Sequence, residues 1–215
     1  MPKAKSLYPR PDGCDPDELL QPHPGTARMV TLAEQEIADA KAVSSATFER
    51  WRDILGQARA PRLLYDCWTA RQISRRTLRQ HVGSIWHTSD IPDYWLTHDQ
   101  WRELFSAAGY THVVANLISA RAMIGGYEQG IQDSPPRAPL TVYRGSIRAR
   151  RDDWSWTASP AVAARWASGN QYGRPAGHVW VTTAPPENLL CRIDRWDQYV
   201  VDTAGLHITQ HTEGV

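Results

Sequence analysis

The sequence has few cysteines, no long apolar run and almost no net charge, and each shortage excludes a class of protein. Cys14, Cys67 and Cys191 are odd in number and far apart, which argues against a disulfide framework and against a cysteine-based zinc site. The apolar stretches fall far short of the ~20 residues that a membrane-spanning helix needs, so we expect no membrane partner. A formal net charge of +1 gives no reason to expect a nucleic-acid-binding surface.

Residues 1–29 contain six prolines and little apolar content. Such a stretch cannot bury enough surface to offset the entropy of ordering, so we interpret it as an extended arm. Its first lysines have no apolar core behind them, which argues against a secretory signal and makes a cytoplasmic location our expectation. Because 41% of the whole chain is apolar, the remainder is predicted to fold.

Residues 30–133 are predicted to be mainly helical, because apolar residues recur there every three or four positions. The first predicted helix runs from Thr31 to Leu55, with Thr31 and Glu34 as a capping box. The same spacing predicts three more helices, over 62–82, from Thr97 or His98 to Gly109, and over 110–127.

A proline-rich stretch at 134–139 ends this pattern, and residues 134–215 are predicted to be rich in strands. Runs of β-branched and aromatic residues predict strands over 140–143, 178–183 and 199–201. A helix is predicted between them at Pro160–Ala167, with proline at its first position. A helical part followed by a strand-rich part predicts an α+β fold, with both parts in one compact unit.

Several standard catalytic motifs are missing from the sequence. It has no glycine-rich dinucleotide fingerprint, no Walker loop, no HExxH metal motif and no Gly-x-Ser-x-Gly elbow. We interpret four histidines that share no ligand spacing as surface or packing residues, and we expect no bound metal. They are His81, His87, His98 and His112.

Three other segments place polar groups at the ends of predicted strands. In the first, Arg144 offers a planar fork of donors for a phosphate or carboxylate, and Gly145 allows a ligand to approach the backbone. The second, 154–160, combines hydroxyls with indoles, and the third, 196–202, opens a strand with polar groups. Each has a structural alternative: Arg144 paired with an aspartate, the hydroxyls as strand and cap residues, and Asp197-Gln198 as a turn.

In this order the segments resemble the ADP-ribosyltransferase superfamily, in the bacterial-toxin clade described by an Arg, Ser, Glu triad. Tyr143-Arg144-Gly145 resembles the arginine strand of that family. Residues 155–159 and the helix after them resemble its Ser-Thr-Ser strand and following helix, and 178–190 resemble the strand and turn before its third motif. Residues 197–202 then fall where the family has Glu-x-Glu, so the resemblance covers roughly residues 140–206.

The resemblance implies a small split β-sheet core that binds NAD as a substrate. It implies that Arg144 holds the NAD phosphates and ribose, and that the backbone of Gly145 contacts the nicotinamide amide. It implies a hydroxyl strand that supports the ribose and the catalytic acid, and an aromatic ring, Trp166, against the nicotinamide. The catalytic residues it implies are Gln198, Arg144, Thr157 and Ser159, and the cofactor-binding residues are Arg144, Gly145, Ser155, Trp156, Thr157 and Trp166.

The two glutamate positions of the family are occupied here by Trp196 and Gln198. Gln198 can bond a ribose hydroxyl but brings no negative charge to an oxocarbenium-like transition state. Losing one such electrostatic contact typically costs a factor of ~100–1000 in rate. Asp197 is adjacent, but in a regular strand neighbouring side chains point to opposite faces. Asp197 could serve only if the strand starts later or carries a bulge there.

We therefore expect an NAD-dependent mono-ADP-ribosyltransferase, such as a toxin or a phage effector, whose acceptor is a macromolecule and more readily a protein than a nucleic acid. The alternatives are a slow NAD glycohydrolase and a catalytically degenerate module that binds NAD, ADP-ribose or a protein partner. A helical structural protein with an unrelated β-rich end is a further alternative. Every version of this expectation, the binding module included, requires the guanidinium of Arg144 to lie on the same side of the sheet as Thr157 and Gln198.

Overall fold

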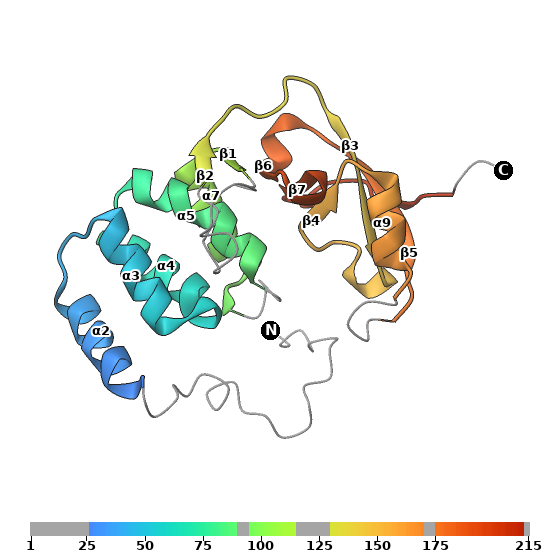
Figure 1. Ribbon diagram of the computed structural model, residues 1–215. Coiled ribbons are helices and arrows are strands. Elements are labelled where there is room, and N and C mark those ends of the chain that lie inside the picture. Colours follow the sequence, from blue (N-terminus) through green and yellow to red (C-terminus); the bar gives the residue numbers. More distant parts are fainter. Residues whose placement is uncertain (1–25, 90–94, 115–129, 170–174, 213–215) are drawn as a thin grey trace, which may run out of the picture.

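The computed structural model describes residues 26–89, 95–114, 130–169 and 175–212, and it combines helices with a mixed β-sheet (Figure 1). The expected α+β composition is confirmed in this coarse form, since every described α-helix except α9 (Pro160–Ala167) precedes the strands. The proline-rich arm, 1–29, lies almost wholly outside the described residues. Within the described ranges, the helices are all too short or too polar to cross a membrane.

Helices make up the described part of the chain up to Ala108, and polar caps set where several of them begin. Ser44 and Ser74 accept hydrogen bonds from the backbone amides three residues on, and Thr97 forms a full capping box with Gln100. The prediction of a helix from Thr97 or His98 to Gly109 is confirmed. The helices are α2 (Ala27–Asp39), α3 (Ser45–Leu55), η1 (Gln57–Arg59), α4 (Ala60–Thr69), α5 (Arg75–Thr88) and α7 (His98–Ala108).

The single helix predicted from Thr31 to Leu55 is wrong, because the structure divides it into α2 and α3. The carboxamide of Gln72 donates to the carbonyls of Ile37 and Ala40 at 2.7 and 2.9 Å, which satisfies the end of α2. Thr31 is not a cap but lies inside α2, where its hydroxyl donates to the carbonyl of Ala27. A distant side chain therefore ends a helix that local periodicity would continue.

The helix predicted over 62–82 is also wrong, since α4 ends at Thr69 and α5 begins at Arg75. The turn between them is a Schellman motif, in which the amide of Gln72 donates to Cys67 and that of Arg71 to Trp68. Arg71 occupies the left-handed position of this motif with φ +59°, where glycine is usual. The chain then turns back, and Ser74 caps α5.

The strands form one eight-stranded sheet in the order β2-β1-β6-β7-β4-β3-β5-β8. Neighbouring strands are antiparallel, apart from the parallel pair β1 and β6. The predicted strands at 140–143, 178–183 and 199–201 are confirmed, as is the helix at Pro160–Ala167, now α9. The strands are β1 (Thr111–Val113), β2 (Gly130–Gln132), β3 (Leu140–Ser146), β4 (Ser155–Thr157), β5 (His178–Ala184), β6 (Leu189–Ile193), β7 (Gln198–Val201) and β8 (Thr209–Gln210). Short 3₁₀ turns are η2 (Arg148–Arg150), η3 (Pro186–Asn188) and η4 (Arg195–Asp197).

The helix predicted over 110–127 is wrong at its start, because Thr111–Val113 is strand β1, and residues 115–129 lie outside the described residues. Parallel pairing with β6 draws this segment into the sheet. There Val113 is fully buried beneath Gly83 of α5, where an added Cβ would lie 2.7 Å from the valine methyl. The close approach of α5 to β1 requires glycine at position 83.

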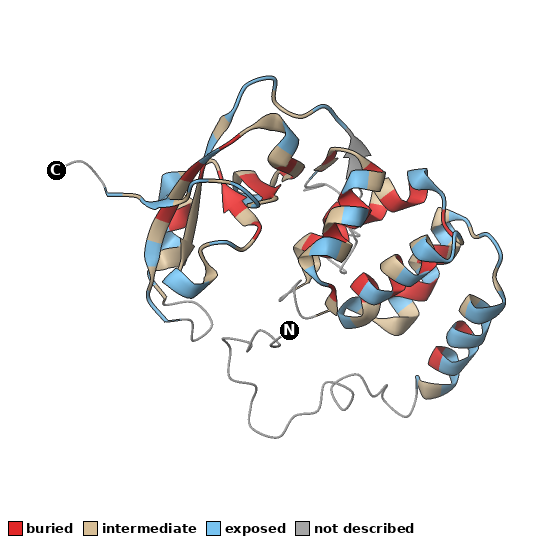
Figure 2. Ribbon diagram, turned by 180° about the vertical axis from the view of Figure 1, so that it is seen from behind, coloured by how far each residue is buried: buried red, intermediate tan, exposed pale blue. Residues whose placement is uncertain are grey.

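Each face of the sheet has its own apolar core, and Figure 2 colours the buried residues red along the helices and strands. The larger core lies between the helices and one face of the sheet, where the ring of Trp154 stacks with those of Trp86 and His98 at distances of 5.7 and 4.8 Å. A bidentate ion pair between Arg102 of α7 and Asp202 after β7 closes over it, at 2.6 and 3.0 Å. The smaller core on the other face includes Trp156.

Candidate functional site

Strand register decides which of the predicted site residues share a face of the sheet. Thr157 pairs with Tyr143 on one side and with Gln198 on the other, so these three side chains point to one face. Arg144 follows Tyr143 directly and pairs with Trp180, which belongs to the core of the opposite face. The expectation that Arg144, Thr157 and Gln198 lie on one side of the sheet is therefore wrong for Arg144.

The guanidinium of Arg144 fastens the loop between β3 and β4. Its Nε donates to the carbonyl of Arg150 at 2.8 Å, one terminal nitrogen to the carbonyl of Ser155 at 2.6 Å, and the other to Asp153 at 2.8 Å. Asp153 also accepts from Arg150 at 2.6 Å, and the Arg144 side chain is only 11% exposed. The structural alternative for Arg144 was pairing with an aspartate across the sheet. An aspartate is its partner, but Asp153 lies in the loop between β3 and β4 and not on a neighbouring strand.

The hydroxyls of the β4 segment are engaged within the protein. The fully buried Thr157 hydroxyl donates to the carbonyl of Trp196 at 2.8 Å and accepts from the amide of Ser159 at 3.1 Å. The Ser159 hydroxyl caps α9 by accepting from the amide of Val162. Ser155 provides the carbonyl that receives Arg144. Thr157 and Ser159 thus set the geometry around Gln198 and α9.

The predicted aromatic contacts divide between the two faces. Trp156 is fully buried on the Arg144 face, and its indole N–H donates to the carbonyl of Asp153 at 2.8 Å. The expectation that Trp156 contacts a cofactor is therefore wrong, because its ring has no accessible surface. Trp166 of α9 instead meets Trp196 edge to face at 6.2 Å. Trp196 is 46% exposed, and the guanidinium of Arg195 lies over its ring, 4.5 Å from the ring centre.

Gly145 lies directly beneath α9. A Cβ at this position would collide with the carbonyl of Ala163 and with the amide nitrogen of Ala167. The absence of a side chain therefore allows the helix to approach β3, whereas the sequence suggested the approach of a ligand. The same contact places Trp166 over the strand, since its Cβ lies 2.8 Å from the same point.

A left-handed corner immediately precedes Gln198. Trp196 and Asp197 have φ values of +62° and +47°, which is an unusual conformation for two consecutive residues that are not glycine. The corner is held by the β4 segment, because Thr157 bonds the carbonyl of Trp196 and the amide of Ala158 bonds that of Asp197 at 3.1 Å. Backbone strain of this kind persists only where the surroundings enforce it, and it concentrates at functional sites.

Sequence reasoning missed His87, which lies in the last turn of α5 and hydrogen-bonds the side chain of Gln198. Burial and the nearby charge of Arg195 lower the pKa of His87, while the bond to Gln198 opposes this shift. The ring is therefore neutral at pH 7. No spacing could have linked residues 87 and 198, because packing of α5 across the sheet joins them.

The carboxylate of Asp197 does not replace the missing glutamate. It lies 3.7 Å from Arg192, whose strand position pairs with Tyr199 on the opposite face from Gln198. It also contributes to raising the pKa of Tyr199, after the larger effect of burial. Alternation along the chain, expected from the sequence, thus holds through the corner: Asp197 is directed to one face and Gln198 to the other.

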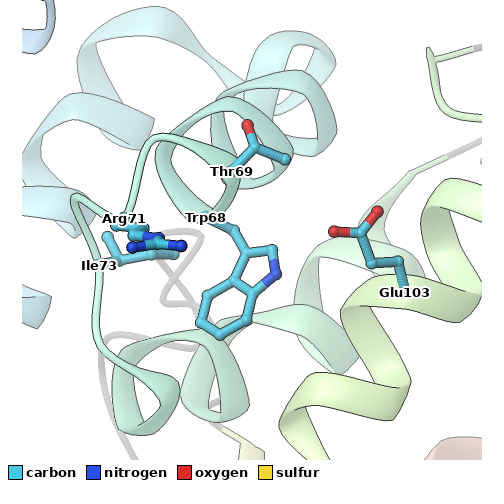
Figure 3. Close-up of a pocket in the computed structure, with 5 residues that line it drawn as sticks. All are labelled: Trp68, Thr69, Arg71, Ile73 and Glu103. Carbon is cyan, nitrogen blue, oxygen red and sulfur yellow. The ribbon is translucent and has the colours of Figure 1, made fainter.

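A pocket of about 380 Å³ lies elsewhere, between the end of α4 and α7 (Figure 3). None of the predicted site residues lines it, and the left-handed Arg71 at its edge is explained by the Schellman motif. Its lining residues are Trp68, Thr69, Arg71, Ile73 and Glu103.

Over the described ranges, no three side chains of histidine, cysteine, aspartate or glutamate gather as a metal site would require. Comparison with known proteins finds no match: no family model, no curated protein and no solved structure is similar to this chain.

Proposed function

We propose that the strand-rich part of the chain is a catalytically degenerate module of the ADP-ribosyltransferase type, which binds NAD or ADP-ribose. One observation carries this proposal: the three strands with the family-like motifs are consecutive neighbours, in the order β7-β4-β3. They come from separate stretches of sequence, and a shared nucleotide site requires them to meet. The proposal includes the finer fold expectation, a split β-sheet core of that family.

The surroundings of Gln198 support nucleotide binding on the face that it shares with Thr157. There α5 contributes His87 from one side, and α9 contributes Trp166 from the other. The partly exposed indole of Trp196 adds an aromatic surface, and Arg195 places a guanidinium over one part of it. This proposal departs from the expectation drawn from the resemblance, because Arg144 lies on the other face of the sheet. There it stabilises β4 and does not contact the ligand, so the proposal keeps only the order of the three strands.

The same surroundings favour binding of NAD without its cleavage. Glycosidic cleavage of NAD develops positive charge on the ribose, and the neutral Gln198 does not stabilise it. A carboxylate lost from such a position costs a factor of about 100–1000 in rate. Because Asp197 lies on the other face beside Arg192, it does not compensate.

The test combines binding with turnover on the purified chain. We expect NAD or ADP-ribose to raise the melting temperature, because a ligand of the native state stabilises it by mass action. Nicotinamide release from NAD should stay near background for the native chain and rise by at least about 100-fold in the Gln198→Glu variant. The Gln198→Ala variant is the matched control, which should remain at background. No melting shift with either ligand would rule out the module.

An active mono-ADP-ribosyltransferase is the second candidate, favoured by the strained corner at Trp196 and Asp197. For this function NAD is the substrate, and a macromolecule, more readily a protein than a nucleic acid, is the acceptor. The native chain should then release nicotinamide and label cell extract from labelled NAD above the level of Gln198→Ala. Equal labelling by the two proteins would exclude this candidate and leave the binding module.

A further inference from the structure

The pocket between the end of α4 and α7 is a second place where a ligand can bind, separate from the strands discussed above. Its volume of about 380 Å³ falls within the range of roughly 300–1,000 Å³ that is typical of small-molecule sites. The indole of Trp68 is partly buried against the larger core, and Ile73 is only 4% exposed. These two side chains give the pocket an apolar lining.

Opposite charges stand on the two sides of this lining. Figure 3 shows Arg71 on one side of the indole and Glu103 on the other, and both residues are exposed. Glu103 accepts a hydrogen bond from the hydroxyl of Tyr65 at 3.2 Å through Oε2, which leaves Oε1 for a donor of the ligand. Within the described ranges the guanidinium of Arg71 has no hydrogen bond and no ion pair, so its donors are available too.

The Schellman motif explains the backbone conformation of Arg71 but not its side chain. The motif requires a left-handed residue, and glycine is the usual one because it has no Cβ. An arginine strains the backbone there, and strained residues of this kind cluster at ligand sites. A guanidinium at this position is explained if its charge serves the pocket.

The two charges together select the class of ligand. A simple anion would be attracted by Arg71 and repelled by Glu103, and a simple cation would meet the reverse. A zwitterion suits both residues when its charged groups lie apart. We propose that the pocket binds a zwitterion with a carboxylate and an ammonium at opposite ends of a short aliphatic chain, as in a lysine residue at the carboxyl end of a peptide.

Each part of such a ligand has a matching group in the pocket. The carboxylate meets the planar fork of Arg71, the aliphatic stem covers the indole of Trp68, and the ammonium meets Glu103. The inference is independent of the proposed nucleotide binding, because none of the residues assigned to that site lines this pocket.

An NMR titration of the full chain with four small probes tests the proposal. 6-Aminohexanoate carries its charges at opposite ends, whereas its isomer norleucine carries both at one end, and hexanoate and hexylamine each keep one charge. We expect 6-aminohexanoate to bind at least about tenfold more tightly than the other three, since losing one charged contact costs about that factor. It should also shift the indole N–H resonance of Trp68, which is assigned by its loss in Trp68→Phe. Equal binding of norleucine, or no shift of this resonance, would overturn the proposal.

Variants assign the two charged contacts. Arg71→Gly supplies the usual residue of the turn, and it should weaken 6-aminohexanoate at least about tenfold while hexylamine binds no more weakly than before. Glu103→Gln should weaken 6-aminohexanoate in the same way but spare hexanoate. The matched control is Arg76→Gln, which removes an exposed charge of α5 outside the pocket lining and should leave all affinities unchanged. Equal affinity of 6-aminohexanoate for Arg71→Gly and Arg76→Gln would refute the role of Arg71 and the proposal with it.

A peptide identifies the source of the zwitterion. Acetyl-glycyl-lysine with a free carboxylate should compete with 6-aminohexanoate, and the same peptide with an amidated carboxyl end should compete at least about tenfold less well. Binding of 6-aminohexanoate without competition by the free-acid peptide would keep the site and assign a free ω-amino acid to it. Equal competition by the two peptides would contradict carboxylate recognition and overturn the proposal.

Discussion

The hydroxyl of Thr157 donates to the carbonyl of Trp196 at 2.8 Å, and so the middle strand of the site holds the left-handed corner before Gln198. Thr157 is fully buried, which leaves no water to replace the bond. We expect Thr157→Val to lower the free energy of unfolding by about 2 kcal/mol, because the carbonyl then loses its buried donor.

The control for this change is Thr157→Ser, which keeps the hydroxyl and loses one methyl group, at a cost of about 1 kcal/mol. Urea denaturation of both variants measures the difference. If the valine variant were as stable as the serine variant, the hydrogen bond would not hold the corner.

The ion pair of Arg144 with Asp153 should contribute far more than an exposed pair. Arg144 and Asp153 are 11% and 20% exposed, so we expect a coupling energy of about 1–3 kcal/mol from a double-mutant cycle with Arg144→Met and Asp153→Asn. The matched control is Arg62 and Asp66, whose side chains are 59% and 49% exposed. That pair should couple by less than about 1 kcal/mol. Equal couplings would contradict the bracing role of Arg144.

The buried His81 makes the fold sensitive to acid. Burial and the charge of Arg52 lower its pKa to about 3, whereas the unfolded chain has the ordinary value of 6.5. Below pH 6.5 the unfolded state binds a proton that the folded state does not, so stability is full above that pH and falls as the pH decreases. Between pH 7 and 5 this histidine should remove about 2 kcal/mol from the free energy of unfolding.

Urea denaturation at several pH values measures this loss. The His81→Gln variant should have a slope shallower by about 1.4 kcal/mol per pH unit below pH 6.5, whatever its absolute stability. His87 changes stability in the same direction and is present in both proteins, so the difference reports on His81 alone. Parallel slopes would show that His81 takes up its proton without unfolding.

The left-handed Arg71 offers a stabilising substitution. At φ +59° a Cβ costs about 1 kcal/mol, which glycine avoids. Arg71→Gly should therefore be more stable than Arg71→Ala, by somewhat less than about 1 kcal/mol. The greater conformational freedom of glycine in the unfolded chain offsets part of the gain. Comparing the two variants by thermal unfolding removes the effect of losing the guanidinium. A more stable alanine variant would contradict the Schellman geometry of this turn.

Local signals in the sequence were sufficient to predict an element that carries its own start and stop residues. Proline at the first position predicted α9 with its correct bounds, and Thr97 and Gly109 predicted α7. Local signals were insufficient where a residue far away in the sequence ends an element or pairs with it. Gln72 ends α2 from 35 residues away, and pairing with β6 turns Thr111–Val113 into a strand.

The strands that carry the candidate site were predictable from the sequence. The face of the sheet on which each side chain lies was not. Asp197 and Gln198 point to opposite faces as predicted, but Asp197 lies in η4 before β7, where the left-handed corner sets its direction. The placement of Arg144 failed because it depends on the register between β3 and β4, which no residue near the turn specifies. His87 was not found, because it reaches Gln198 from a helix of the other half of the chain.

The parallel pairing of β1 with β6 means that the strand-rich part is not self-sufficient. Cut off after Gln132, it would leave β6 as an open edge and would strip Trp154 of both rings that stack with it. Recombination that moved only the strand-rich part into another protein would therefore separate it from elements that it needs to fold. The helices and the strands of the sheet are inherited together, and any relative with the same sheet must carry both.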